Sequence, residues 1–191
     1  MHLNTVFLQA LSLLSVASAA AVPAPAANAA HRARGNSCLC LEVATEIVND
    51  FLSLISAYNN DTANALLADS FVDTSDSINY LAGIPLGGPT FPSKAIFELG
   101  QGSQPPVPIS LLNIDAVTCD GVIAFRWVGY PATAQLEVKG INILYTVNGG
   151  DKNSVGPGGW QISQVFSEFN SAAWITDLGL PCNPPPAPPG A

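Results

Sequence analysis

Carboxylates, amides and phenols are the side chains in this sequence that could carry out chemistry, because residues 37–182 contain no histidine. The two histidines of the chain, His2 and His31, both lie near the N-terminus. A Ser-His-Asp triad, a Cys-His pair and a histidine-ligated zinc site each need an imidazole, so none of them can be built from residue 37 onward. What remains is proton transfer by carboxylic acids and tyrosines, or binding without reaction.

Three acidic residues and one tyrosine deserve testing as proton-transfer groups. Glu168 is either a buried carboxylate that moves a proton, or a residue near a strand end that is solvated or bonded to backbone. Asp73 and Asp76, in the segment Asp73-Thr-Ser-Asp76, are either a carboxylate pair or formers of a turn and a helix cap. The catalytic candidates are Glu168, Asp73 and Tyr80, although a hydroxyl at the edge of the core also explains Tyr80.

Arg126 is the one arginine beyond the first 36 residues, and it lies in the middle of the strand-like segment 122–128. If Asp120-Gly121 is a two-residue hairpin turn, Asp115 faces Arg126 and the two form an ion pair on the outer face of the sheet. A one-residue bulge would instead turn Arg126 inward, toward Glu168. The two-residue turn also predicts the cross-strand pairs Cys119–Val122, Ala116–Phe125 and Ile114–Trp127, with Ala116 and Ile114 on the inner face.

The N-terminus has the pattern of an export signal. An apolar run from Val6 to Val16 precedes Ala17-Ser18-Ala19, a small-x-small motif that a signal peptidase accepts. We therefore predict a secreted, extracellular protein with four segments: a signal peptide (1–19), an Ala/Pro-rich arm or propeptide (20–36), a single domain (37–182) and a Pro-rich tail (183–191).

The predicted domain is strongly acidic. It holds four cations and all fourteen acids of the chain, so its formal charge is 4 − 14 = −10. Nucleic acid and anionic membranes would repel such a domain, which argues against both as partners. The apolar run at the N-terminus is too short to span a membrane, and no second long run follows. We expect neither a cofactor nor a metal.

The chain has four cysteines, Cys38, Cys40, Cys119 and Cys182. In an exported chain they predict two disulfides. A bond between Cys38 and Cys40 would close a strained small ring, so each is expected to reach one of the two distant cysteines, and which goes to which is open. A zinc site is the alternative, but the spacing lacks the paired pattern of a zinc ribbon.

Helices are expected in the first half of the domain. Apolar residues recur at three- and four-residue steps from Leu41 to Tyr58, which predicts a long amphipathic helix. Asp61 is expected to cap a short helix through Leu67, and another is expected over 93–100. Asn60-Asp61-Thr62 is also an N-glycosylation sequon, so Asn60 either carries a glycan or lies in a turn without one.

Strands are expected in the second half, where the apolar pattern changes to alternation. The segments are Val107–Thr118, Gly121–Tyr130, Gln135–Val147 and Trp160–Phe169. Because helices come first and strands last, the sequence predicts an α+β fold with helices on one face of an antiparallel sheet.

The chain resembles the nuclear transport factor 2-like superfamily, of the SnoaL-like and scytalone-dehydratase type, and within it small secreted fungal members of unknown function. The matching segments are 47–55, Asp69-Ser-Phe-Val-Asp73, Phe91-Pro-Ser-Lys94, Phe125-Arg-Trp127, 140–144, Trp160 and 166–170. The resemblance implies a cone: a strongly curved sheet around a long helix and two short ones, with a cavity open at one end. The superfamily hosts many activities, and its best-known dehydratases use a cavity histidine that is missing here.

Strand alternation selects the polar groups that would face this cavity. In the last strand, Trp160, Ile162, Gln164, Phe166 and Glu168 share the more apolar face and are expected to point inward. In the preceding strand the inward face would hold Leu136, Val138, Gly140, Asn142 and Leu144. The predicted ligand-binding residues are Asn142, Gln164 and Glu168 from the sheet, with Tyr58 and Asp76 from the helical side.

Three functions fit these features. The first is a binding module that holds a small apolar ligand in the cone. The alternative is a cofactor-free lyase, isomerase or hydrolase that uses carboxylate and tyrosine acid-base chemistry. The third is a homodimer or interaction protein that uses an apolar patch on the outer sheet face, made of Ile141, Ile143, Tyr145 and Val165.

Overall fold

The computed structural model describes residues 38–132, 136–149 and 155–180. The predicted signal peptide (1–19), arm (20–36) and tail (183–191) lie outside these residues, as does Cys182. In the described part of the chain, no helix has the length and apolar character needed to cross a membrane.

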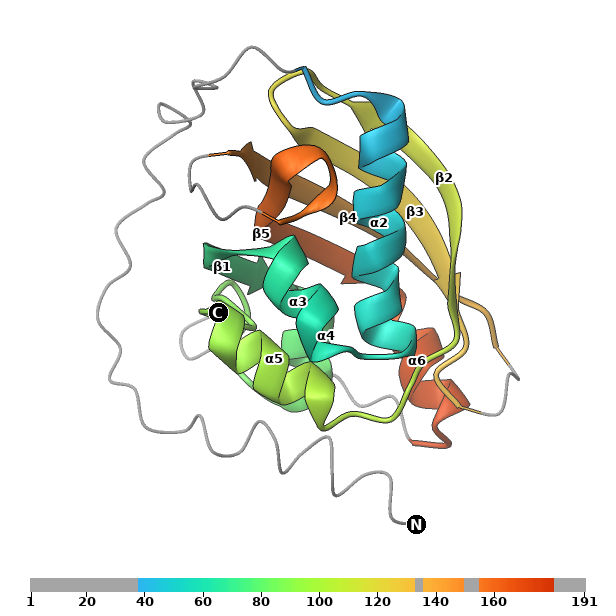
Figure 1. Cartoon of the computed structure of the whole chain (residues 1–191). Coiled ribbons are helices and arrows are strands. Elements are labelled where there is room, and N and C mark those ends of the chain that lie inside the picture. The colour runs from blue at the N-terminus through green and yellow to red at the C-terminus, as the bar shows by residue number, and fades with distance from the viewer. Residues whose placement is uncertain (1–37, 133–135, 150–154, 181–191) are drawn as a thin grey trace.

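Helices and strands follow one another in the predicted order, with additional short elements. The helices are α2 (Leu41–Ser56), α3 (Asn60–Leu66), α4 (Asp76–Ala82), α5 (Lys94–Gly102) and α6 (Ser171–Asp177), and a 3-10 turn, η1, covers Pro157–Gly159. The strands are β1 (Leu67–Thr74), β2 (Ile109–Val117), β3 (Val122–Gly129), β4 (Val138–Asn148) and β5 (Trp160–Phe169). Figure 1 shows the sheet curving around α2.

The long helix α2 packs its apolar face into this curve. Its buried residues are Ala44, Ile47, Val48, Phe51, Leu52 and Leu54, and they belong to one core cluster with residues of the inner sheet face and of α5. Burial of these side chains stabilises the helix far more than its intrinsic propensity does. The helix therefore forms the central axis of the cone.

The cap of α3 differs from the prediction. The Asn59 side chain, rather than that of Asp61, accepts the hydrogen bond from the Thr62 N–H, at 3.0 Å. A capping side chain reaches the N–H two or three residues farther along, so the helix that starts at Asn60 is capped by the residue before it. Asp61 lies in the first turn, where its charge favours the helix N-terminus.

The sheet has five strands in the order β1-β5-β4-β3-β2. The four strands predicted from residue 107 onward pair antiparallel with one another. The fifth strand, β1, was not predicted, and it pairs parallel with β5. The segment that contains Asp73 is therefore part of the sheet and not a turn.

The hairpin of β2 and β3 has a different register from the predicted one. Its loop spans three residues, because Thr118 bonds to Val122. Two irregularities in β2 then shift the pairing, at Leu112 and at Asp115. The observed pairs are Val117–Ile123, Ala116–Ala124, Ile114–Phe125, Asn113–Arg126 and Leu111–Trp127. Ile114 packs against the core as expected, whereas Ala116 is exposed.

The outward ion pair of Arg126 is confirmed, although Asn113 and not Asp115 is its direct cross-strand neighbour. Asp115 is the extra residue of a bulge, and both of its oxygens accept hydrogen bonds from Arg126, from Nε and from Nη2, each at 2.8 Å. The hydrogen bond from Arg126 is the main reason why the pKa of Asp115 is lowered to about 2. Arg126 is therefore no part of the inner face.

A disulfide between Cys38 and Cys119 ties the start of α2 to the β2–β3 hairpin. This is one of the pairings that the sequence left open. Beside it, the Leu39 N–H donates to the Cys119 carbonyl at 3.2 Å, and the Leu39 side chain is buried. Cys40 is a free, exposed thiol among the described residues. The second predicted bridge involves Cys182 and stays a prediction.

Candidate functional site

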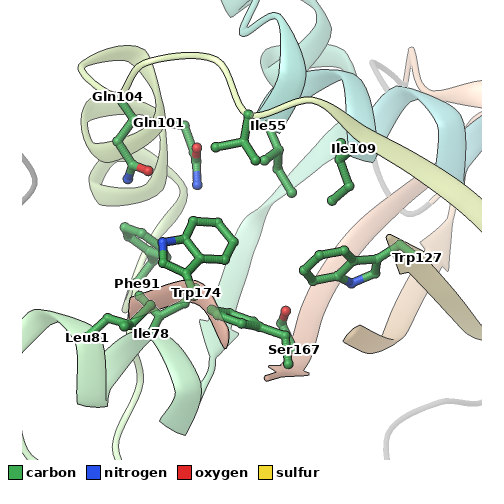
Figure 2. Close-up of a pocket in the computed structure, with 12 residues that line it drawn as sticks. Ile55, Ile78, Leu81, Phe91, Gln101, Gln104, Ile109, Trp127, Ser167 and Trp174 are labelled. Atoms are coloured by element: carbon green, nitrogen blue, oxygen red, sulfur yellow. The ribbon is translucent and has the colours of Figure 1, made fainter. Parts of the chain in front are cut away.

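An apolar pocket opens between the helices α2, α4, α5 and α6 and the inner face of the sheet, and Figure 2 shows its walls. Its cavity volume is about 60 Å³. Nine of the twelve lining side chains are apolar, and the polar ones are Gln101, Gln104 and Ser167. The apolar set is Ile55, Ile78, Leu81, Phe91, Val107, Ile109, Trp127, Phe169 and Trp174. Such a lining, with few polar groups, is typical of small-molecule sites.

The sheet wall of the pocket is held by a buried amide. Asn142 Oδ1 accepts hydrogen bonds from Trp127 Nε1 at 2.6 Å and from Ser167 Oγ at 3.1 Å. Asn142 is on the inner face, as strand alternation predicted, and it is buried. It does not itself line the pocket. It therefore positions two lining residues, Trp127 and Ser167, instead of presenting its own amide to a ligand.

The indole of Trp127 can lie flat against β4 because residue 140 is a glycine. A Cβ on Gly140 would lie 2.5 Å from indole atom Cε2 and 2.9 Å from the Phe169 side chain. Distances below 3.0 Å are essentially never found for real Cβ atoms. A side chain at position 140 would therefore push the indole away from the sheet and into the pocket.

The helical wall is formed by α4, with Ile78 and Leu81, by α6, with Trp174, and by the end of α5 next to Phe91. The Phe97 ring of α5 makes edge contacts with Phe71 and Phe91. Gly100 lets α5 approach this cluster, since a Cβ there would lie 2.8 Å from the Phe91 ring. The last turn of α5 then brings Gln101, and the loop after it brings Gln104, to the pocket (Figure 2).

A bulge in β5 reverses the predicted facing of its second half. Thr146 pairs with Ile162 but Tyr145 pairs with Gln164, so Ser163 is an extra residue. Trp160 and Ile162 point inward as predicted, and after the bulge the inward residues are Val165, Ser167 and Phe169. The prediction that Gln164, Phe166 and Glu168 face the cavity is wrong for this reason.

Glu168 instead holds the start of α4. Its oxygens accept hydrogen bonds from the N–H groups of Asp76, at 2.8 Å, and Ser77, at 3.0 Å, and from the Ser77 hydroxyl. These N–H groups have no partner within the helix, and a carboxylate at this end also interacts favourably with the helix dipole. The geometry favours the backbone-bonded alternative for Glu168 over proton transfer in the pocket.

Asp73 is a fully buried carboxylate of β1. It lies beside Val165, and its Oδ1 has no hydrogen-bond partner among the described residues. Burial, and next the charge of Glu168, raise its pKa to about 7, while a hydrogen bond from the Thr74 backbone opposes this shift. Asp73 does not line the pocket.

The remaining candidates lie away from the pocket lining. Asp76 Oδ1 accepts a hydrogen bond from the Gly87 N–H at 2.6 Å, so it orders the loop after α4. The Tyr58 hydroxyl donates to Asn60 Oδ1 at 3.2 Å, and burial and the nearby Glu98 raise its pKa. Tyr80 is half-buried in α4. Asn60, the predicted glycosylation site, is exposed.

Sequence patterns did not identify Gln101, Gln104 or Ser167 as pocket residues. Gln101 lies in the last turn of α5 and Gln104 in the loop after it, and both follow the helix that the sequence predicts over 93–100. Because a loop has no fixed period, no sequence pattern placed either amide at the pocket. Ser167 was assigned to the outer face because the bulge at Ser163 cannot be seen in the alternation.

Solved structures with this fold have low sequence identity to the chain. A loop-truncation variant of IdmH, a proposed polyketide cyclase from Streptomyces antibioticus, is 15% identical with a TM-score of 0.50, over 71% of this chain and 98% of that one. The CaMKII hub of S. rosetta is 10% identical with a TM-score of 0.52, over 78% and 100%. At such identities the likeness shows the fold alone. No curated protein matches the chain significantly.

The family is shown by sequence. The family model of the NTF2-like domain matches residues 37–181, most of the chain. The matched range contains every described element, from α2 to α6. A curved sheet around a long helix, with a pocket at the inner face, agrees with this match. The chain therefore belongs to the NTF2-like domain family.

Proposed function

We propose that this protein is an exported NTF2-like domain that binds a small apolar molecule in the pocket between the helices α2, α4, α5 and α6 and the sheet. The observation that carries the proposal is the lining, in which nine apolar side chains surround three neutral polar ones. Burial of apolar ligand surface against such a lining contributes about 25 cal/mol per Å².

Two indoles support this proposal. Trp127 and Trp174 extend into the pocket from the sheet and from α6, and Figure 2 shows both rings bordering one space. The Trp127 ring is held in place by Asn142, and the Phe169 ring packs against both Trp127 and Trp174. Aromatic walls fixed in this way bind flat apolar groups without a large loss of side-chain entropy.

The alternative of acid-base catalysis has weaker support. General acid-base catalysis needs an acid or base within hydrogen-bond reach of the substrate. None of the pocket-lining residues is a carboxylic acid or a tyrosine. Glu168 accepts hydrogen bonds from the start of α4, and Asp73 is not one of the pocket-lining residues. The geometry therefore favours binding over reaction at this pocket.

Toluene is expected to bind the pocket with a Kd on the order of millimolar, about −4 kcal/mol for a ligand of this size. Ligand-observed NMR measures this Kd. The variant Leu81→Trp, which enlarges a lining side chain on α4, should weaken binding about tenfold or more. The matched control, Leu99→Trp, adds the same side chain at an exposed position of α5 outside the pocket and should leave the Kd unchanged. Equal affinities of the two variants would contradict the proposed site.

A second candidate function is self-association through the outer sheet face. Ile141, Ile143 and Phe166 are exposed there, and Ile143 pairs directly with Phe166 across the strands. Tyr145 contacts the Phe166 ring edge-on. Val165, which the sequence placed in this patch, is buried on the inner face because of the β5 bulge, and Phe166 takes its place. The outer patch is thus Ile141, Ile143, Tyr145 and Phe166.

We expect sedimentation velocity at micromolar concentration to show a dimer. Ile143→Lys would place a charge in the centre of the outer patch and should raise the dimer Kd at least about 30-fold. Leu99→Lys, at an exposed site on α5, is the control and should not change it. A wild-type protein that sediments as a monomer would refute self-association by this surface.

A further inference from the structure

The polar groups of the pocket are all neutral. They are the amides of Gln101 and Gln104 and the hydroxyl of Ser167. Ser167 is already engaged, because it donates to Asn142. No hydrogen bond joins either glutamine amide to another residue in the described part of the chain. These two amides are therefore the groups left to contact a ligand.

The cationic side chains in the described part of the chain all form ion pairs or hydrogen bonds outside the pocket. Arg126 is paired with Asp115 on the outer face, and Lys139 with Glu137 at 3.3 Å. Lys94 donates to the carbonyls of Asn64 and Leu67. None of the three lines the pocket. An anionic ligand group would therefore find no opposite charge there, and the acidic domain would repel it.

The two amides are placed to select a ligand with a polar group. In Figure 2 the Gln101 side chain extends from α5 toward the space above the indole of Trp174. Both glutamines are half-buried, so a ligand that enters the pocket removes water from their amides. An amide that loses water without gaining a partner costs free energy, whereas a ligand hydroxyl or carbonyl restores the hydrogen bond.

The space limits the apolar part of the ligand. About 60 Å³ is room for roughly four to six water-sized spheres. That is less than half of the roughly 150 Å³ that encloses a benzene molecule, so the walls take in part of a single ring, and a fused multi-ring body would project farther out of the pocket.

We propose that the pocket selects an uncharged single-ring molecule bearing a hydroxyl or carbonyl group, which hydrogen-bonds to Gln101 and Gln104. This inference rests on the proposed binding function and adds the chemical class of the ligand. Contact with the apolar walls provides most of the binding free energy. The two amides distinguish a ligand with a hydroxyl or carbonyl group from one without it.

Four probes that share one methylated ring test the inference: toluene, p-cresol, p-toluate and 4-methylbenzylammonium. Their Kd values are measured by ligand-observed NMR on the full chain. We expect p-cresol to bind about 3- to 10-fold more tightly than toluene, the range of one or two neutral hydrogen bonds. The anion and the cation should both bind more weakly than p-cresol.

The double variant Gln101→Leu/Gln104→Leu should abolish the preference for p-cresol while toluene still binds. The matched control, Gln164→Leu, makes the same exchange on the opposite side of the sheet and should keep the preference. Near-equal binding of toluene and p-cresol to the wild type, a preference that survives the double variant, or tighter binding of either ion would each overturn the inference. Failure of all four probes to bind would instead refute the proposed binding function itself.

Discussion

Replacing Cys38 and Cys119 by serine is expected to lower the free energy of unfolding by about 4 kcal/mol. The bond joins residues 81 positions apart, and closing a loop of that length in the unfolded chain removes entropy worth about 4 to 5 kcal/mol as an upper figure. It also fixes the start of α2 against the β2–β3 hairpin, where Leu39 is buried. Urea unfolding of the double variant, compared with the oxidised wild type, measures the loss.

The single variant Cys40→Ser separates this bridge from the second one predicted from the sequence. It leaves the bond between Cys38 and Cys119 intact, so any stability it loses would come from a bond between Cys40 and Cys182. Mass spectrometry of non-reduced peptides should recover Cys38 linked to Cys119. A peptide map in which Cys38 is joined to another cysteine would contradict the structure.

Asp73→Asn is expected to stabilise the protein at pH 8 by up to about 4 kcal/mol and to change stability little at pH 4. The pKa of Asp73 is about 7 in the folded state, against 3.8 for an ordinary aspartate, and each unit corresponds to about 1.4 kcal/mol. The raised folded-state pKa means that the native protein binds more protons than the unfolded chain between these values. Wild-type stability from this group is thus fully present below about pH 4 and is lost as the pH rises through 7.

Unfolding in urea at pH 4, 6 and 8 tests this expectation. Because other groups titrate too, the informative quantity is the difference between variant and wild type at each pH. Asp69→Asn is the control, since Asp69 is exposed on the same strand, and its difference should stay near zero throughout. If Asp73→Asn destabilises equally at all three pH values, the carboxylate is stabilised by partners and the arrangement with a buried Oδ1 that lacks a hydrogen bond is wrong.

The elements that the sequence predicted well are those with a long local period. The apolar positions of α2 recur at helical steps and all face the core. In β4, which pairs without irregularity with β3, alternation correctly placed Val138, Asn142 and Leu144 inward. In both cases the pattern repeats over enough residues that a local rule determines which side is buried.

The candidate site was predicted only in part, and the reasons are bulges and distant pairing. One extra residue, Ser163, exchanged the inward and outward faces of β5, which moved Glu168 out of the cavity and Ser167 into it. The strand β1 was missed because its partner, β5, lies far along the chain and the pairing leaves no short-range signal. Arg126 was placed correctly although its predicted register was wrong, since the bulged Asp115 still reaches it.

Composition and local periods are enough to predict the α+β order, the long central helix and the inward position of Asn142, and they show that residues 37–182 hold no histidine. Which polar groups reach the pocket is visible only in the folded protein. Gln101 and Gln104 arrive there because Gly100 lets α5 close onto Phe91, and Ser167 because a single bulge turns β5 over. These contacts depend on packing between distant segments, and neither residue spacing nor hydrophobicity encodes that packing in a form that can be derived from the chain alone.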